Sequence, residues 1–427
     1  MNRFKIRIDL FISYLVILFP IFMILGPLMM NLFSIIMSIY VFLYVKKFKE
    51  IVFSKEKFFI LIASFFLFIF PYDSNNFEES SIKYATYFRH IFMFFGIIIF
   101  FSNIDGIKLL NRAKKFYIVL LLIISIDVLK EHFTGTNFLG SYTDYEGRIA
   151  SFSNDELIIG YIFAFLVLFS FGIISETIKK HYMLIIFYSI IVIIFLIGER
   201  SNFLKLLLII IFFSFFHLLL KNKLKLFKLL NLIFIISLLT ISFLYITKNT
   251  NQAKKLYGLP ISIINNYSLS VPIIKNFYDL KHAPHYLTAL KIFADHPIFG
   301  IGINNFREES KKQKYNDTRL KYSDNRSSTH PHQIYLELLA EVGILGFFYF
   351  VFIFVWSFIA GIRCYLKDNS LNLLGHLMLH IFFIFPILPS GSFFGTIYGL
   401  PFWFNLSILI YLIKKDQIKI LYKNLNN

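Results

Sequence analysis

Long apolar blocks alternate along the chain with short polar connections. The blocks lie near residues 10–26, 28–45, 57–71, 84–102, 116–129, 157–174, 183–198, 202–220, 229–247, 332–360, 371–388 and 398–413. A helix needs roughly 20 apolar residues to cross a bilayer upright, and several blocks are shorter than that. The pattern therefore predicts an all-α, polytopic integral membrane protein with about twelve transmembrane helices, give or take one or two.

Basic clusters mark every second connection. They are Arg3, Lys5 and Arg7; Lys46, Lys47 and Lys49; Lys108, Arg112, Lys114 and Lys115; Lys179 and Lys180; Lys221, Lys223, Lys225 and Lys228; Arg363 and Lys367; and Lys414 and Lys415. Because basic residues stay on the cytoplasmic side, we expect both termini in the cytoplasm and the alternate connections on the outer side of a bacterial inner membrane. No small-residue cleavage site follows the apolar start, so we interpret it as an uncleaved first helix.

One connection is much longer than the others and divides the chain. We predict about nine transmembrane helices in residues 1–247, a long periplasmic loop over 248–331, and about three transmembrane helices with a cytoplasmic tail in 332–427. Within the loop, Tyr286, Leu287, Leu290 and Phe293 follow helical spacing. We expect an amphipathic helix over about 283–295 that lies on the membrane face, ended by the following proline.

Composition agrees with a membrane protein. Hydrophobic residues make up 57% of the 427 residues, and the mean hydropathy is +0.68. The formal net charge is +18, but the 56 phenylalanines and abundant Ile, Lys and Asn are typical of an AT-rich coding sequence, so the charge is not used as a sign of function. The single cysteine, Cys364, excludes an intramolecular disulfide and cannot by itself form a thiolate metal site.

The candidate site of chemistry lies where the long polar loop meets an apolar block. There the chain has HQIYLELLAEVGILG, which begins at His332. A histidine titrates near neutral pH, and a neutral imidazole at a membrane surface can accept a proton from an attacking hydroxyl. The alternative is that His332 only caps or packs the start of a helix. Four supporting residues follow on the same helix: Glu337, Glu341, Gly343 and Gly346.

Motifs in the last third of the chain resemble those of a known protein family. The segment ADHPIFGIGINNF, the long outer loop and the pattern His-Gln, nine residues, Gly, two residues, Gly-Phe resemble the O-antigen ligases, which are grouped with the O-antigen polymerases. The resemblance implies an all-helical membrane fold like that of the type C membrane glycosyltransferases. It also implies transfer of a glycan from an undecaprenyl (polyprenyl) diphosphate carrier to the lipid A core in lipopolysaccharide biosynthesis, with the matching histidine, His332, as the catalytic residue.

Two other functions remain open at this point. An O-antigen polymerase would use the same base and the same diphosphate site, but would join carrier-linked repeat units. A polysaccharide flippase would also suit about twelve spans, although a long loop with an interfacial histidine is unlike the broken helices and midplane charges of transporters. The expected partners are the lipid-linked donor, the lipid A core acceptor and membrane lipids, with no nucleic acid.

The departing diphosphate needs fixed cations. Arg200, in the short turn GERSNF, can hold phosphate oxygens with its guanidinium fork, and the resemblance implies this role; the alternative is an arginine that reaches lipid phosphates. Relatives carry a second arginine before HPxFGxG, where this chain has Lys281, His282 and His285, so the second clamp is in doubt. The further donor-binding candidates are Arg307, Arg89 and Arg148. We expect Arg200 and His332 to act in one extracytoplasmic pocket.

Motifs that the sequence lacks limit the reactions that the protein could catalyse. The first outer turn, LGPLM, is uncharged, and the outer loops carry few close acidic pairs, so we predict a metal-independent transferase that needs no cofactor. The chain has no Walker-type phosphate loop and no dinucleotide fingerprint. The energy for transfer then comes from the phosphate ester of the carrier, and a single displacement predicts inversion at the anomeric carbon.

Overall fold

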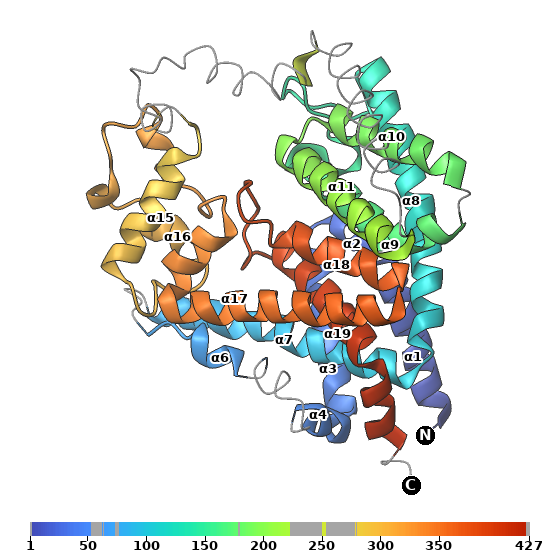
Figure 1. The fold of residues 1–427 in the computed structure, drawn as a ribbon. Helices are drawn as coiled ribbons and strands as arrows, with labels where there is room; N and C mark the ends of the chain where they lie inside the picture. The colour runs from blue at the N-terminus through green and yellow to red at the C-terminus, as the bar shows by residue number, and fades with distance from the viewer. Residues whose placement is uncertain are drawn as a thin grey trace. The chain divides into compact units, whose positions relative to one another are not determined.

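The computed structural model describes residues 2–52, 62, 64–72, 77–177, 180–222, 250–252, 278 and 280–423. Across these ranges every regular element is a helix (Figure 1). The helices follow the apolar blocks that the sequence predicts. The block at 229–247 and residues 57–61 and 63 of the block at 57–71 lie outside the described residues.

The chain divides into two compact units. One comprises residues 1–113 and 272–427, and the other comprises residues 114–271. The first unit contains α1 (Asn2–Ile17), α2 (Phe19–Leu25), α3 (Pro27–Leu43), α4 (Val45–Val52), α6 (Phe65–Phe68), α7 (Phe77–Asn103), α15 (Ala283–Asp295), α16 (Phe306–Glu309), η2 (Gln313–Tyr315), η3 (Ser323–Arg326), α17 (Ile334–Asp368), α18 (Leu371–Phe383) and α19 (Thr396–Lys423). The second contains most of α8 (Gly106–Thr134), with η1 (Ser151–Glu156), α9 (Ile159–Thr177), α10 (Lys180–Ile197) and α11 (Arg200–Asn222).

Several helices can cross a membrane by length and composition. Among the described residues these are α7, α9, α17 and the Thr396–Lys415 part of α19, which makes 4 spans. The number rises to 6 if the bent pairs α1–α2 and α3–α4 each count as one span. A helical protein with multiple spans is therefore supported, while the figure of about twelve stays a prediction.

In the first unit, α7 packs against both α3 and α19. Gly96 permits the first contact, because a Cβ there would lie 2.2 Å from the carbonyl oxygen of Met37. On the other side, the indole of the buried Trp403 donates a hydrogen bond of 3.0 Å to the hydroxyl of Tyr87. Small residues and satisfied polar groups at such contacts are typical of helices that pack within a membrane.

Helix α15 has the bounds that the sequence predicts, but it buries a different face. His285, Thr288, Ala289 and Ile292 are buried, and the helix packs against α17, whereas Leu290 is 44% exposed. The residues predicted to face the membrane, Tyr286, Leu287, Leu290 and Phe293, lie on the half-buried to exposed side of the helix, and their contact with lipid stays a prediction. Small side chains face α17 because they allow two backbones to approach closely, which the size of the apolar residues does not reveal.

In the second unit, two acidic residues of α8 fix the loop that follows the helix. Glu131 accepts hydrogen bonds from the backbone N–H groups of Ala150 (3.0 Å) and Ser151 (2.7 Å). Asp127 accepts from the N–H of Phe138 at 2.7 Å and from the hydroxyl of Ser151. Each buried carboxylate thereby satisfies buried backbone donors and sets the path of the chain on either side of Arg148.

Candidate functional site

The long helix α17 is broken at Gly343, where φ is 63° and ψ is −168°. A turn over residues 297–302 fills the break. The N–H groups of Ile344 and Leu345 donate to the carbonyls of Pro297 and Ile298 at 2.8 and 3.4 Å. In the other direction, the N–H groups of residues 301 and 302 donate to the carbonyls of residues 340 and 341 at 3.1 and 2.9 Å. The break is therefore a docking point for the glycine-rich segment IFGIGINNF.

Two glycines make this docking possible. A Cβ on Gly343 would lie 2.3 Å from the carbonyl oxygen of Ile298, and a Cβ on Gly300 would lie 2.6 Å from the nitrogen of Gly343. The dihedral angles of Gly343 also lie in a region that is essentially open to glycine alone. The glycine in the sequence motif is thus required by backbone contact, since the loop and the helix touch main chain to main chain.

Two buried carboxylates of α17, Glu337 and Glu341, hold loops on either side of the helix. Glu341 accepts from the N–H groups of Asn304 (2.7 Å) and Phe306 (3.1 Å). Glu337 accepts from the hydroxyl of Ser392 and from the N–H of residue 393 at 2.8 Å. Because both residues lie in the first turns of the helix that begins beside His332, they fix the loops around the histidine.

His332 lies immediately before α17 in an unusual backbone conformation. Its φ is +58°, a left-handed conformation that few non-glycine residues adopt, although histidine adopts it more readily than most. The carbonyl of His332 accepts a hydrogen bond of 2.9 Å from the N–H of Ser390. Gln333 caps the helix instead, since its side chain accepts from the N–H of Leu336 at 2.8 Å. The interpretation of His332 as a helix cap was therefore wrong, and its imidazole is directed elsewhere.

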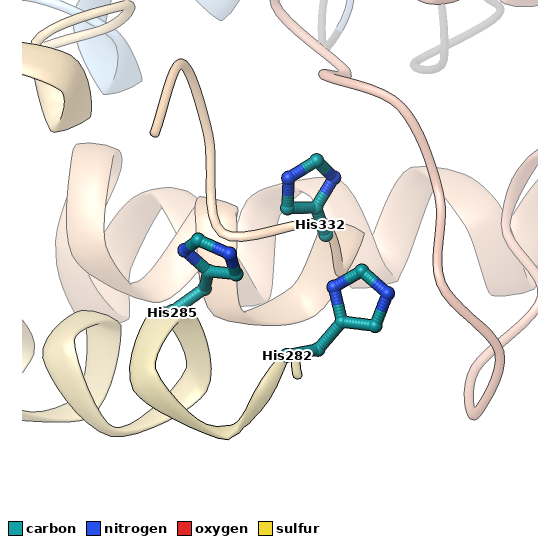
Figure 2. Close-up of side chains that lie close together, drawn as sticks. All are labelled: His282, His285 and His332. Atoms are coloured by element: carbon teal, nitrogen blue, oxygen red, sulfur yellow. The ribbon is translucent and has the colours of Figure 1, made fainter. Parts of the chain in front are cut away.

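The imidazole of His332 lies in a cluster of histidines. Figure 2 shows His282 and His285, from the start of α15, on either side of His332, which comes from the loop before α17. The ring centroids of His282 and His285 lie 5.2 and 5.0 Å from that of His332. His330 lies closer, at 4.2 Å. Two pairs of histidines from separate segments of the chain thus form one group (the histidine cluster).

Hydrogen bonds orient these rings. Nε2 of His332 lies 3.1 Å from the hydroxyl oxygen of Ser328, and Nδ1 of His285 lies 3.4 Å from the carbonyl oxygen of Arg326. Nε2 of His330 lies 3.2 Å from the carbonyl oxygen of Ser390. A carbonyl only accepts, so the facing nitrogens of His285 and His330 carry the proton and their other nitrogens keep the lone pair.

The cluster favours neutral imidazoles. Burial, and then the neighbouring histidines, hold the pKa of His332 far below its usual value. Burial likewise lowers the pKa of His285, and it lowers that of His330 to about 4. A charged imidazole would lose hydration and would repel its neighbours. At neutral pH, His332 therefore has a lone pair available.

In the second unit, the structure brings Arg148 and Arg200 into neighbouring turns. The N–H of Ile149 donates to the carbonyl of Ile197 at 3.1 Å. A Cβ on Gly198 would lie 2.0 Å from the carbonyl oxygen of Gly147, so the two glycine turns touch. Burial and the charge of Arg148 both lower the pKa of Arg200, and two cations held this close favour an anion between them.

Glu199 stabilises this pair of turns. Its carboxylate accepts from the N–H of Gly160 at 2.8 Å and from the amide of Asn202 at 2.5 Å. Burial raises the pKa of Glu199, while these donors and the guanidinium of Arg148 act against that rise. The carboxylate thus holds the start of α11, where Arg200 lies.

The other predicted donor-binding residues are spread over the first unit. Lys281 is exposed beside His282, and Arg307 is exposed on α16. The guanidinium of Arg89, on α7, donates to the carbonyl of Thr86 and to the hydroxyl of Thr396.

Gly346, the second glycine of the α17 motif, lies three residues after the break at Gly343. A Cβ on Gly346 would lie 2.5 Å from the side chain of Val342.

The sequence did not identify every member of the site. His285 and Ser328 were not predicted to contact His332, and Ser390, which fixes the backbone of His332, is 58 residues away from it in the chain. The signal that was present is the pair of histidines three residues apart at the start of a helix. Their common direction toward His332 depends on how α15 packs on α17.

Comparison with protein families gives one finding. Residues 182–351 match the family model Wzy_C, described as O-antigen ligase, and this segment includes both Arg200 and His332. A comparison with curated proteins found no match. The match confirms the resemblance seen at the motif that begins at His332. Through residues 182–351, this chain is similar to the Wzy_C family model, described as O-antigen ligase.

Proposed function

We propose that the protein is an O-antigen ligase-like glycosyltransferase of the bacterial inner membrane. It moves a glycan from an undecaprenyl diphosphate carrier to the lipid A core on the periplasmic side, with both of its own termini in the cytoplasm. The observation that carries the proposal is His332, held at a positive φ within the histidine cluster, inside the segment that matches the family model. A lone pair in such a place suits the activation of an acceptor hydroxyl.

The proposed step is a single displacement. The acceptor oxygen forms a bond to the anomeric carbon while the bond from that carbon to the diphosphate oxygen breaks. The hydroxyl proton passes to His332, and the bonding electron pair leaves with the diphosphate. Attack from the side opposite the leaving group inverts the configuration at the anomeric carbon. The negative charge of the diphosphate raises the proton affinity of a nearby imidazole, so the bound donor favours this transfer.

Arg200 and Arg148 are the proposed clamp for the diphosphate. Two guanidinium groups in touching turns offer two planar forks for phosphate oxygens, and the strongest hydrogen bonds in proteins are those between such charged groups. Arg148 then takes the role of the second arginine that the sequence lacks before HPxFGxG. Lys281, His282, Arg307 and Arg89 remain further candidates for binding the donor or the phosphates of the core.

Replacing Arg200 with lysine is expected to lower kcat/KM for the carrier-linked donor by about 10- to 100-fold. Lysine keeps the charge but loses the fork, and a hydrogen bond to a charged group contributes about 1.5–3 kcal/mol. Steady-state transfer with purified protein measures this. Arg112→Lys, at an exposed position on α8, is the matched control and should retain wild-type kinetics. Wild-type kcat/KM in Arg200→Lys would exclude a bidentate clamp at this position.

Reconstitution separates the ligase from the polymerase. Purified protein in liposomes receives a defined carrier-linked glycan with either core lipid or a second carrier-linked glycan as acceptor. We expect the glycan to appear on the core lipid. If only the carrier-linked product grows, the protein is an O-antigen polymerase, and movement of the glycan across the bilayer without transfer would indicate a flippase.

A deletion strain gives an independent result. A strain that lacks a ligase keeps full-length polymer on the carrier and leaves the lipid A core bare. A strain that lacks a polymerase attaches only single repeat units to the core. Electrophoresis of the lipopolysaccharide distinguishes these patterns, and we expect the first.

A further inference from the structure

Three members of the histidine cluster point into one space. In Figure 2, His282 and His285 flank His332 and the three rings surround a common gap. One nitrogen of each ring lies within 4.8 Å of one nitrogen of each of the others. His285 is buried, while His282 and His332 are half-buried, so the group is held firmly on one side and open on the other.

We propose that His282, His285 and His332 form a site for a single zinc ion, and that the ion inhibits transfer by occupying His332. The binding site stands on the geometry alone. The inhibitory effect rests on the proposed function, in which His332 is the base.

The distances suit a zinc ion after a small contraction. Zinc binds histidine nitrogens at about 2.0–2.1 Å in a tetrahedral arrangement, so that its ligand nitrogens lie about 3.4 Å apart. The three nitrogens, within 4.8 Å of one another, must approach by up to about 1.4 Å. Rotation of the side chains can supply this, because each ring ends a side chain with two rotatable bonds. Three protein ligands leave the fourth position open to water, as in catalytic zinc sites.

The hydrogen bonds that the histidine rings make on their far side also fit a metal site. A histidine that binds a metal usually donates its other ring N–H to a carbonyl, carboxylate or water, which fixes the tautomer and the ring orientation. The carbonyl of Arg326 does this for Nδ1 of His285, which leaves Nε2 with the lone pair. The hydroxyl of Ser328 lies 3.1 Å from Nε2 of His332 and can accept the N–H of that nitrogen, which would leave Nδ1 with the lone pair. One ring thus has the partner that a metal ligand requires, and a second has a group that can serve as one.

The type of ligand selects the metal. Imidazole nitrogens suit zinc, copper and nickel, whereas magnesium and calcium prefer oxygen ligands. Only histidines make up this group of ligands. The cluster is therefore a poor site for magnesium.

Binding and catalysis at His332 exclude each other for a chemical reason. A neutral imidazole has a single lone pair, and the other ring nitrogen carries a proton. A zinc ion bound to His332 uses that lone pair, so the ring cannot accept the proton of the acceptor hydroxyl. Occupation of the site switches off the base without any change of fold.

The first test measures binding without activity. Purified protein is treated with EDTA, freed of EDTA and dialysed against zinc, and the bound metal is then measured by mass spectrometry. In a parallel sample, cobalt replaces zinc as a spectroscopic probe of the ligand geometry. We expect one equivalent with a cobalt spectrum typical of low coordination number. His285→Ala and His285→Gln should weaken binding by at least about 10-fold, because even loss of an outer partner costs that much. His132→Ala, at an exposed histidine on α8, should bind as the wild type does.

The second test measures transfer, with each variant compared with its own rate in EDTA. Transfer by the wild type should persist in EDTA and fall when zinc is added, whereas zinc should affect His285→Ala at least 10-fold more weakly. Equal zinc binding by His285→Ala and the wild type would overturn the site. Tight binding at the cluster without inhibition would keep the site and reject His332 as the base, and abolition of transfer by EDTA would reject inhibition by the metal.

Discussion

Replacing His332 with alanine is expected to reduce transfer by about 10²- to 10⁴-fold, which is the range that a positioned base contributes. The acceptor hydroxyl would then attack without a group to take its proton. Insertion into the membrane and binding of the donor should persist, because the cap of α17 comes from Gln333 and the carboxylates Glu337 and Glu341 keep their partners. Transfer assays and donor binding with purified protein measure both quantities.

A second variant separates the base from the backbone. His332 has a φ of +58°, and asparagine tolerates this conformation better than alanine does. His332→Asn should therefore match the thermal unfolding of the wild type and still lack transfer. Added imidazole should restore part of the rate of His332→Ala, since a small base can occupy the space that is left. If either variant retains wild-type transfer, His332 is not the base.

Replacing Gly343 with alanine is expected to destabilise the protein by several kcal/mol and to abolish transfer. Alanine at this φ and ψ costs about 1–3 kcal/mol in backbone strain alone. Its Cβ would also lie 2.3 Å from the carbonyl oxygen of Ile298, so the turn at 297–302 must leave the break in α17. The hydrogen bonds between the two segments would then be lost. Thermal unfolding in detergent and transfer assays measure the two effects.

Gly140→Ala is the matched control for this substitution. Gly140 also has a positive φ, of +80°, but a Cβ there would meet nothing within 4 Å. It should show only the backbone strain, about 1 kcal/mol. A stability of Gly343→Ala equal to that of Gly140→Ala would mean that contact between the turn and the helix does not matter.

The sequence predicted the helices well where local pattern decides them. Within the described residues the apolar blocks coincide with helices, and the helix at Ala283–Asp295 has its expected bounds because its spacing and the proline after it are local signals. The sequence did not show that the opposite side of this helix, with Ala289 and Thr288, packs on α17. Close packing against α17 selects small residues, and a single sequence does not show which helix will be the neighbour.

The site was predicted in part. His332 stood out because its motif is contiguous, and the family match supports that motif. The contact of His285 with His332 and the proximity of Arg148 to Arg200 depend on segments that meet only in the folded chain. The pattern also gave no indication that Glu337 and Glu341 bind loop backbone, because a buried carboxylate can equally well pair with a cation or a neighbouring helix.

The break at Gly343 also has a mechanical consequence. A continuous helix transmits tilt along its whole length. At Gly343, however, the backbone hydrogen bonds within α17 are interrupted, and the groups on either side bond to the 297–302 turn instead. The short segment from Ile334 to Val342 is thereby fastened to the polar loops. Spanning helices change their inclination when bilayer thickness changes. Because the 297–302 turn bonds to residues on both sides of Gly343, a change in the inclination of the part of α17 after the glycine would also be transmitted to this turn.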